Sequence, residues 1–140
     1  MKKIASILFV MLLVCGCNNK NEKKEPVVSD LTCEQELFNG ESAIIYNYNF
    51  TFEDDNLTKA VYTNSFIYDE SKKDLYSGYL LSIVEEYNKI QGVDASLDSD
   101  VLTINYDING MNENDIIESG LDKKKDEIKE IYQNKGYSCN

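Results

Sequence analysis

The feature that most constrains the fold is an unbroken two-residue alternation along residues 43–52. Every second side chain in this run is large and apolar or aromatic: Ile44, Tyr46, Tyr48, Phe50 and Phe52. The side chains between them are mostly small or polar: Ala43, Ile45, Asn47, Asn49 and Thr51. A strand of this kind has one face for a core and one face for water, which is typical of an antiparallel sheet that is covered on one side.

The neighbouring segments extend this strand into a meander. Residues 31–38 also alternate, and the Asn39-Gly40 pair that follows them is a strong signal for a tight hairpin. Residues 53–56 form a polar turn, and residues 57–68 are rich in β-branched and aromatic side chains. We therefore expect three consecutive antiparallel strands.

Residues 75–90 change to the period of a helix. Their apolar side chains fall within half of a helical cylinder: Leu75, Tyr76, Tyr79, Leu80, Ile83, Val84, Tyr87 and Ile90. This predicts an amphipathic helix of about 16–18 residues, with Gly92 as the C′ residue that ends it. After it, residues 95–97 and 101–108 are expected to form a short and a longer strand around a turn at residues 98–100.

The last segment again has apolar residues at helical spacing. The stripe is narrower than the first and consists of Ile117, Leu121, Ile128, Ile131 and Tyr132. Gly120 is expected to interrupt this segment, and Gly136 to end it with Tyr137 in reach of Tyr132. The order βββ-α-ββ-α predicts an α+β fold: an antiparallel sheet of about five strands with helices packed on one face, in a single domain over residues 31–140.

The N-terminus has the pattern of a lipoprotein signal peptide over residues 1–16. Two lysines precede an apolar run at residues 4–14, which is too short to span a bilayer. The run ends in Val14-Cys15-Gly16-Cys17, which resembles a bacterial lipobox and predicts lipidation of Cys17. The alternative is a short, uncleaved membrane anchor. Residues 17–30 are polar and aperiodic, so we expect the lipidated cysteine to be followed by a flexible tether.

Two cysteines remain after lipidation, Cys33 and Cys139, near the two ends of the predicted domain. An exported protein meets a compartment that does not reduce disulfides, so we expect these two residues to form one disulfide. The alternative is a pair of free thiols with a redox or metal-binding role.

Composition excludes several classes of function. The chain of 140 residues has no His and no Arg, which removes His-dependent nucleophile pairs and the bidentate reader of phosphate and guanine. Removal of residues 1–16 takes away two lysines and no acid, so the net charge falls from −11 to −13. Such a surface repels nucleic acid and anionic headgroups. We expect no nucleic-acid partner, no cofactor and no enzymatic activity.

Calcium binding is one further hypothesis. In the segment that begins at Asp107, Asn109, Asp115 and Glu118 match positions 3, 9 and 12 of an EF-hand loop. Met111 stands at position 5, where an oxygen ligand is needed, and a register that begins at Asn105 places Ile116 at position 12. The alternative is a turn followed by a helix with Asn112 or Asn114 as its N-cap.

Two acidic clusters and the tyrosines complete the candidates. Residues 53–55 and 98–100 contain carboxylates that could pair for glycosidase-type hydrolysis, or could be solvated turns. The chain has ten tyrosines, and Tyr46 and Tyr48 share the apolar face of the long strand. These aromatic residues either pack in the core with a solvated hydroxyl or line a groove for a glycan, peptide or lipid.

The chain also resembles the YehR-like small bacterial lipoproteins over about residues 1–108. The shared features are the lipobox leader, the polar tether, the tyrosine-rich hairpin, the helix ending in Tyr87-Asn-Lys-Ile90-Gln-Gly92-Val93 and the strand Thr103-Ile-Asn-Tyr106-Asp107. The cysteine pair and the long C-terminal segment depart from that family's core. The resemblance implies a lipid-anchored α+β domain, and it supplies no activity and no functional residues.

These observations together predict a lipid-anchored protein of the cell envelope. It would be held on the extracytoplasmic face of the cell membrane and act as a non-catalytic binding module. A carboxylate-dependent envelope hydrolase and a calcium-dependent surface domain are the alternatives.

Overall fold

A computed structural model of the protein describes residues 24–40 and 42–140. The elements follow one another as β1 (Val28–Asn39), β2 (Ser42–Glu53), β3 (Asn56–Ile67), α1 (Lys73–Tyr87), β4 (Val93–Asp98), β5 (Val101–Asp107), α2 (Glu113–Glu118), α3 (Lys125–Asn134) and β6 (Ser138–Cys139). Two short 3₁₀ turns, Glu70–Lys72 and Ile108–Gly110, precede α1 and α2. The α+β class and the opening meander are confirmed.

The sheet has six strands in the order β4-β5-β3-β2-β1-β6, and every neighbouring pair is antiparallel. The prediction of about five strands was therefore one short. The added strand, β6, has only two residues, and it is defined by its pairing with Cys33 and Glu34 of β1. A two-residue strand carries no periodicity, so the sequence pattern gave no signal for it.

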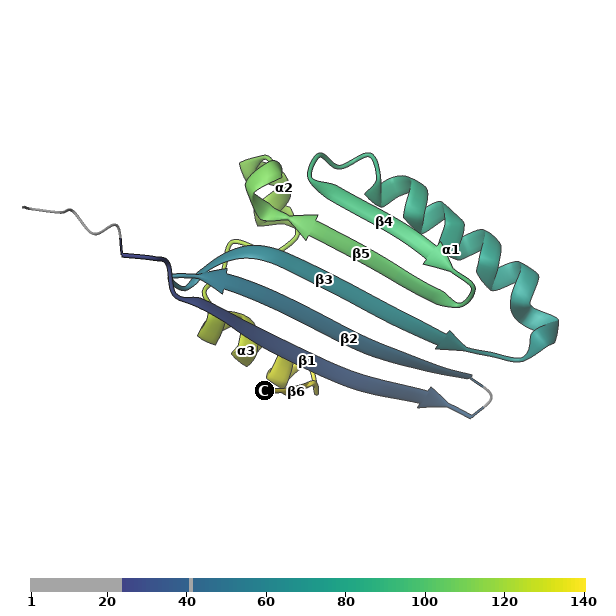
Figure 1. The fold of residues 1–140 in the computed structure, drawn as a ribbon. Helices are drawn as coiled ribbons and strands as arrows, with labels where there is room; N and C mark the ends of the chain where they lie inside the picture. The colour runs from purple at the N-terminus through teal and green to yellow at the C-terminus, as the bar shows by residue number, and fades with distance from the viewer. Residues whose placement is uncertain (1–23, 41) are drawn as a thin grey trace, which may run out of the picture.

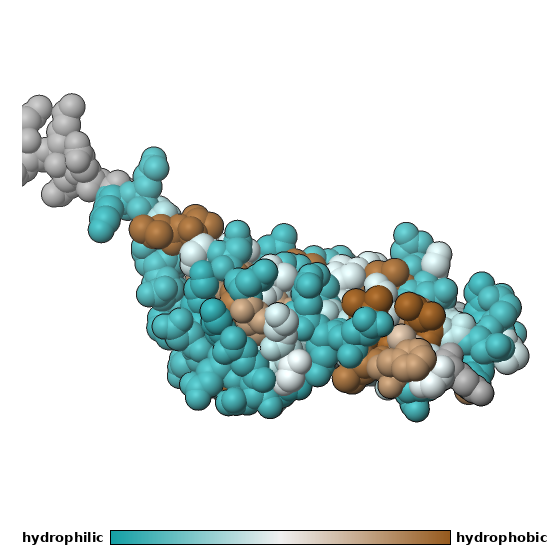
Figure 2. Space-filling view, turned by 90° about the horizontal axis from the view of Figure 1, so that it is seen from below, coloured by the Kyte–Doolittle hydropathy of each residue, from teal (hydrophilic) through white to brown (hydrophobic). Residues whose placement is uncertain are grey.

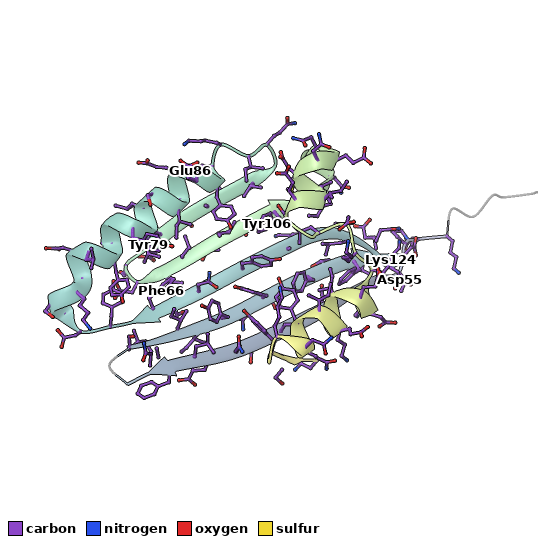
Figure 3. All side chains as sticks on the ribbon, turned by 180° about the vertical axis from the view of Figure 1, so that it is seen from behind. Asp55, Phe66, Tyr79, Glu86, Tyr106 and Lys124 are labelled. Atoms are coloured by element: carbon purple, nitrogen blue, oxygen red, sulfur yellow. A yellow bond between two sulfur atoms is a disulfide. The ribbon has the colours of Figure 1, made fainter. Side chains whose placement is uncertain are left out.

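A crossover places α1 over the sheet. Because β5 is antiparallel to both β3 and β4, these two strands run parallel to each other with β5 between them. Chain connections between parallel strands in one sheet pass over its face, and α1 forms this one (Figure 1). The C-terminal helix α3 lies on the same face, over the β1 side of the sheet (Figures 1 and 3).

The core lies between this face and the helices. Its largest fully buried side chains come from β1, β2, α1 and α3: Leu31, Cys33, Phe50, Phe52, Leu80 and Ile128. The opposite face of the sheet carries hydrogen-bonded polar pairs such as Thr32 with Asn49 (2.8 Å) and Thr51 with Asp30 (2.9 Å). The alternation along β2 thus separates core from solvent as predicted, except that Ala43, which was expected on the solvent side, is buried.

The tether and the first helix differ from expectation at their ends. Strand β1 begins at Val28, so the last three residues of the segment predicted as a tether are paired with β2. Helix α1 ends at Tyr87 with Asn88 as its C-cap, and Gly92 is therefore not its C′ residue. Gly92 has a φ of 81° and lies where a Cβ would come within 2.7 Å of the backbone of Gly110 and Met111. Because glycine has no side chain, the backbone at Gly92 can approach the backbone of Gly110 and Met111 this closely.

The final helical segment is divided in two by Gly120, which has a φ of 68° after the end of α2. Gly136 ends α3 as predicted. Its N–H donates to the carbonyl of Gln133, and the N–H of Tyr137 donates to the carbonyl of Tyr132, both at 3.0 Å. This is the Schellman arrangement, and it brings the rings of Tyr132 and Tyr137 to a centroid distance of 5.0 Å.

The predicted cysteine pair forms. Cys33 and Cys139 lie opposite each other on β1 and β6, and their sulfur atoms are 2.08 Å apart. The bond closes a loop across 106 positions of sequence, so it ties the C-terminal strand to the first strand of the sheet.

The predicted signal peptide, residues 1–16, and the predicted lipidation site, Cys17, lie outside the described residues. Within residues 24–40 and 42–140, none of the helices has the length and apolar character needed to cross a bilayer.

Replacing both described cysteines with alanine (C33A/C139A) should lower the free energy of unfolding by about 4–5 kcal/mol, because the loop-entropy model gives that value for a closed loop of about 100 residues. Urea denaturation of the full chain measures this difference. Reductant should lower the midpoint of the wild type and leave that of the variant unchanged. A wild-type midpoint that is insensitive to reductant would contradict the structural role of the bond.

Candidate functional site

A continuous layer of aromatic rings covers the middle of the helix-bearing face. Tyr48 of β2 stacks on Tyr62 of β3 with ring centroids 4.2 Å apart, and Tyr62 contacts Tyr106 of β5 at 5.0 Å. The layer continues to α1 through Tyr87, whose ring is 6.2 Å from that of Tyr106. On the other side Tyr132 of α3 contacts Tyr48 at 5.5 Å. The rings therefore join three strands to both long helices.

The layer forms because the register aligns these side chains. Tyr48 lies directly opposite Tyr62, and Tyr62 lies opposite Ile104, next to Tyr106 on the same face of β5. The two helices then supply rings from each side. The hydroxyl of Tyr132 donates a hydrogen bond of 3.0 Å to the hydroxyl of Tyr62, which links α3 to the sheet.

A groove with a volume of about 640 Å³ opens above this layer, between α1 and the α2–α3 side of the molecule. Its floor and walls are aromatic or apolar, and its rim is polar. The lining residues are Tyr62, Glu86, Tyr87, Lys89, Ile90, Tyr106, Glu118, Ser119 and Tyr132. Figure 3 shows Tyr106 on the floor and Glu86 on α1 above it. The volume lies within the range of about 300–1,000 Å³ that is usual for small-molecule sites.

The helix-bearing face of the sheet continues beyond the groove along β3. Tyr62, Asn64 and Phe66 alternate on the same face of this strand. The side-chain oxygen of Asn64 is buried and accepts no hydrogen bond from the described residues. A buried acceptor without a described partner therefore lies between two aromatic residues of this strand.

One flank of α1 borders this open surface. Tyr79 is four residues after Leu75 and seven residues before Glu86, a groove residue. These spacings place all three side chains on one flank of the helix, the flank that lines the groove. The sequence pattern placed Leu75 and Tyr79 in the buried stripe, but they are 75% and 62% exposed. The sheet instead packs against the adjacent stripe, in which Leu80 is fully buried.

Burial keeps the groove phenols neutral. Desolvation is the main cause of the raised pKa values of Tyr48, Tyr62 and Tyr106, and neighbouring tyrosine hydroxyls raise them further. Desolvation also raises the pKa of Tyr132. The groove therefore presents hydroxyl groups that donate and accept hydrogen bonds, and its floor carries no charge at physiological pH.

The rim carries both signs of charge, with acids in excess. Glu86 and Glu118 lie on its two sides, and Lys89 is the cation of the lining. The Lys89 ammonium is 2.5 Å from the Glu86 carboxylate, and hydrogen bonding to this carboxylate raises the pKa of Lys89. This amine is therefore paired with an acid of the rim. A second lysine, Lys135, lies beside the groove with its Nζ 5.4 Å from the ring centroid of Tyr132.

The calcium hypothesis does not gain support. Asp107 ends β5, Asn109 lies in the following 3₁₀ turn, and Asp115 and Glu118 belong to α2. Asp115 is engaged in the cap of α2, where its N–H donates to the side chain of Asn112 at 3.0 Å. Across residues 24–40 and 42–140, no three Asp, Glu or Cys side chains are grouped to hold a metal ion.

The two predicted acidic clusters are turns, and they are far apart. Residues 53–55 join β2 to β3 and residues 98–100 join β4 to β5, at opposite ends of β3 (Figure 1). At about 3.3 Å per residue, some 30 Å of strand separates them, which excludes a shared hydrolytic site. Asp100 instead accepts a hydrogen bond from Tyr68 and raises the pKa of Tyr68 to about 12.

A second apolar surface lies at the end of the β1–β2 hairpin. Figure 2 shows apolar residues gathered at this end of the molecule. The side chains involved are exposed on both faces of the hairpin, and Phe38 is 73% exposed. Leu37, Ile45 and Ile67 belong to the same group. Ile67 also lines a pocket with Tyr68, Asp69, Ser71 and Lys72, but this pocket has one tyrosine where the tyrosine groove has four, so the groove is the better candidate for a ligand site.

Comparison with known proteins supports the fold alone. No family model matches the chain, and no curated protein matches it. Among solved structures, the chain is similar to an NMR structure of a protein from Streptococcus pneumoniae TIGR4, with a TM-score of 0.53 and 15% sequence identity. The match covers 100% of this chain and 98% of that chain. The resemblance to YehR-like lipoproteins stays a prediction.

The raised tyrosine pKa values predict unfolding in alkali. A phenol whose pKa is raised by folding stabilises the native state fully below its unfolded pKa of about 10, and this contribution is lost as pH rises above that value. Urea denaturation between pH 8 and pH 11 should therefore show a constant free energy of unfolding up to about pH 10 and a steep fall beyond it. Tyr62→Phe removes one titrating group and should make the fall shallower. An equal slope in the variant would contradict this role for Tyr62.

Proposed function

We propose that this protein is a lipid-anchored binding module of the cell envelope, and that the tyrosine groove is its ligand site. The observation that carries the proposal is the groove of about 640 Å³ between two helices, which is lined by the half-buried rings of Tyr62, Tyr87 and Tyr132 together with the buried Tyr106. Large aromatic residues are normally covered in a small domain, and a contiguous aromatic surface that stays accessible is typical of a recognition site.

The anchor is proposed from the sequence of residues 14–17. Ten residues separate Cys17 from the start of β1 at Val28. Fully extended, they would reach up to about 35 Å, enough for the domain to engage a ligand beyond the membrane surface. The acidic domain would be repelled by anionic headgroups, which favours a position away from the bilayer.

One observation favours a second candidate function, a carboxylate-dependent hydrolase. Glu86 and Glu118 line the same groove from opposite sides, in contrast to the turn clusters that the sequence pattern suggested. Paired carboxylates across a sugar-binding cleft are the common machinery of glycoside hydrolysis. The binding role remains the first proposal because it requires only the surface itself.

Intact mass of the protein isolated from membranes tests the anchor. The wild type should lack residues 1–16 and carry acyl mass on Cys17, because Gly16-Cys17 fits the processing site. Cys17→Ser should carry no acyl mass, and Cys15→Ser, the matched control, should be processed and acylated like the wild type. An unacylated wild-type chain that retains residues 1–16 would establish the alternative, a short uncleaved anchor.

Sedimentation with isolated envelope material tests the groove in the same full-length proteins. Ser119 is exposed on the groove wall, so Ser119→Trp should fill the groove and reduce binding at least tenfold. Gln133 is exposed on α3 outside the groove, and Gln133→Trp should bind like the wild type. Equal binding by all three proteins would overturn the groove as the ligand site.

A further inference from the structure

We propose that the groove takes a neutral, hydroxyl-rich glycan chain. This inference rests on the proposed function and specifies its ligand. The observations that support it are the aromatic lining of the groove, the exposed side chains that continue along α1, the acceptors at the groove rim, and the acidic charge of the rim and of the chain.

The shape suits a chain rather than a compact ligand. From Tyr62, the floor continues along β3 to Asn64 and Phe66, with about 6.6 Å between successive side chains of this face. The flank of α1 follows the same direction from Glu86 to Tyr79 and Leu75. A linear ligand laid in this direction would contact the half-buried Phe66 and the exposed side chains of Tyr79 and Leu75.

The floor has the two properties that sugar rings require. A pyranose ring has an apolar face of C–H groups, which packs on an aromatic ring, and a hydroxyl edge, which needs hydrogen-bond partners. Tyrosine supplies both from one side chain. Tyr62, Tyr87, Tyr106 and Tyr132 all line the groove, and their hydroxyls lie among the rings.

Acceptors for sugar hydroxyls are also present. The carboxylates of Glu86 and Glu118 and the hydroxyl of Ser119 lie at the rim. A carboxylate accepts hydrogen bonds from two neighbouring hydroxyls, which is a fixed geometry in a glycan and is rare in a peptide.

Charge selects against anionic polymers. The chain has a net charge of −11, and the groove's lysine, Lys89, is already paired with Glu86. A phosphate-rich or uronic-acid polymer would be repelled by the domain and would meet Glu86 and Glu118 at the rim. A neutral glycan avoids this cost.

Titration of the isotope-labelled full chain in detergent, followed by amide NMR, tests the inference. The probes are the tetrasaccharides of N-acetylglucosamine, glucose with β1–4 links and glucose with α1–4 links, together with the neutral peptide acetyl-Leu-Tyr-Leu-amide and a polygalacturonate oligomer. At least one neutral tetrasaccharide should shift the amides of Tyr62, Tyr106 and Ser119. Ser119→Trp should weaken its binding at least tenfold, Glu118→Gln severalfold, and Gln133→Trp not at all.

The possible outcomes separate the glycan inference from the proposed function. Groove shifts with the peptide alone would overturn the glycan and leave a binding module for polypeptides. Groove shifts with polygalacturonate at equal affinity would overturn selection by charge. No groove shifts with any neutral tetrasaccharide would overturn this inference, while envelope binding that Ser119→Trp abolishes would keep the proposed function. If that binding is also insensitive to Ser119→Trp, both fail.

Discussion

The rest of the structure depends on the packing of tyrosine rings across one face of the sheet. The chain has no tryptophan. Tyrosines from β2, β3, β5, α1 and α3 form a continuous aromatic layer in its place. Tyr87 of α1 and Tyr132 of α3 pack against this layer from its two sides. Four of the tyrosines, Tyr62, Tyr87, Tyr106 and Tyr132, also line the groove, so one set of residues serves both the packing and the proposed ligand site.

The C-terminal residues fix the position of α3, which forms one wall of the groove. Gly136 turns the chain at the end of α3, and the disulfide of Cys139 with Cys33 then joins β6 to the edge of the sheet. Between these two points Tyr137 packs on Tyr132 and Tyr48. The disulfide joins β6, the strand that follows α3, to β1. This covalent link fixes the end of α3 and holds Tyr132 in a defined place beside the groove.

The sequence patterns correctly predicted those features that depend only on residues close together in the chain. The alternation along β2 and the glycine at position 136 each specify their structure within a few residues. The sixth strand depends on pairing with Cys33, which is far away in the sequence. The position of Gly92 depends on its close approach to Gly110, which follows after strands β4 and β5. Local periodicity around either element does not include these partners. The groove is of the second kind: the pattern identified an aromatic stripe at Tyr46 and Tyr48, but register and helix placement decide which rings stay open.

The central claim is that this tyrosine layer is a recognition surface as well as a core. Ring-resolved NMR of the full chain with ¹³C-labelled tyrosine, with and without isolated envelope material, tests it most directly. Tyr68 and Tyr76, which stack at 4.8 Å outside the groove, serve as internal controls. The account predicts shifts for the rings of Tyr62, Tyr87 and Tyr106 and none for the control pair. Unchanged groove rings, or shifts confined to Tyr68 and Tyr76, would contradict it.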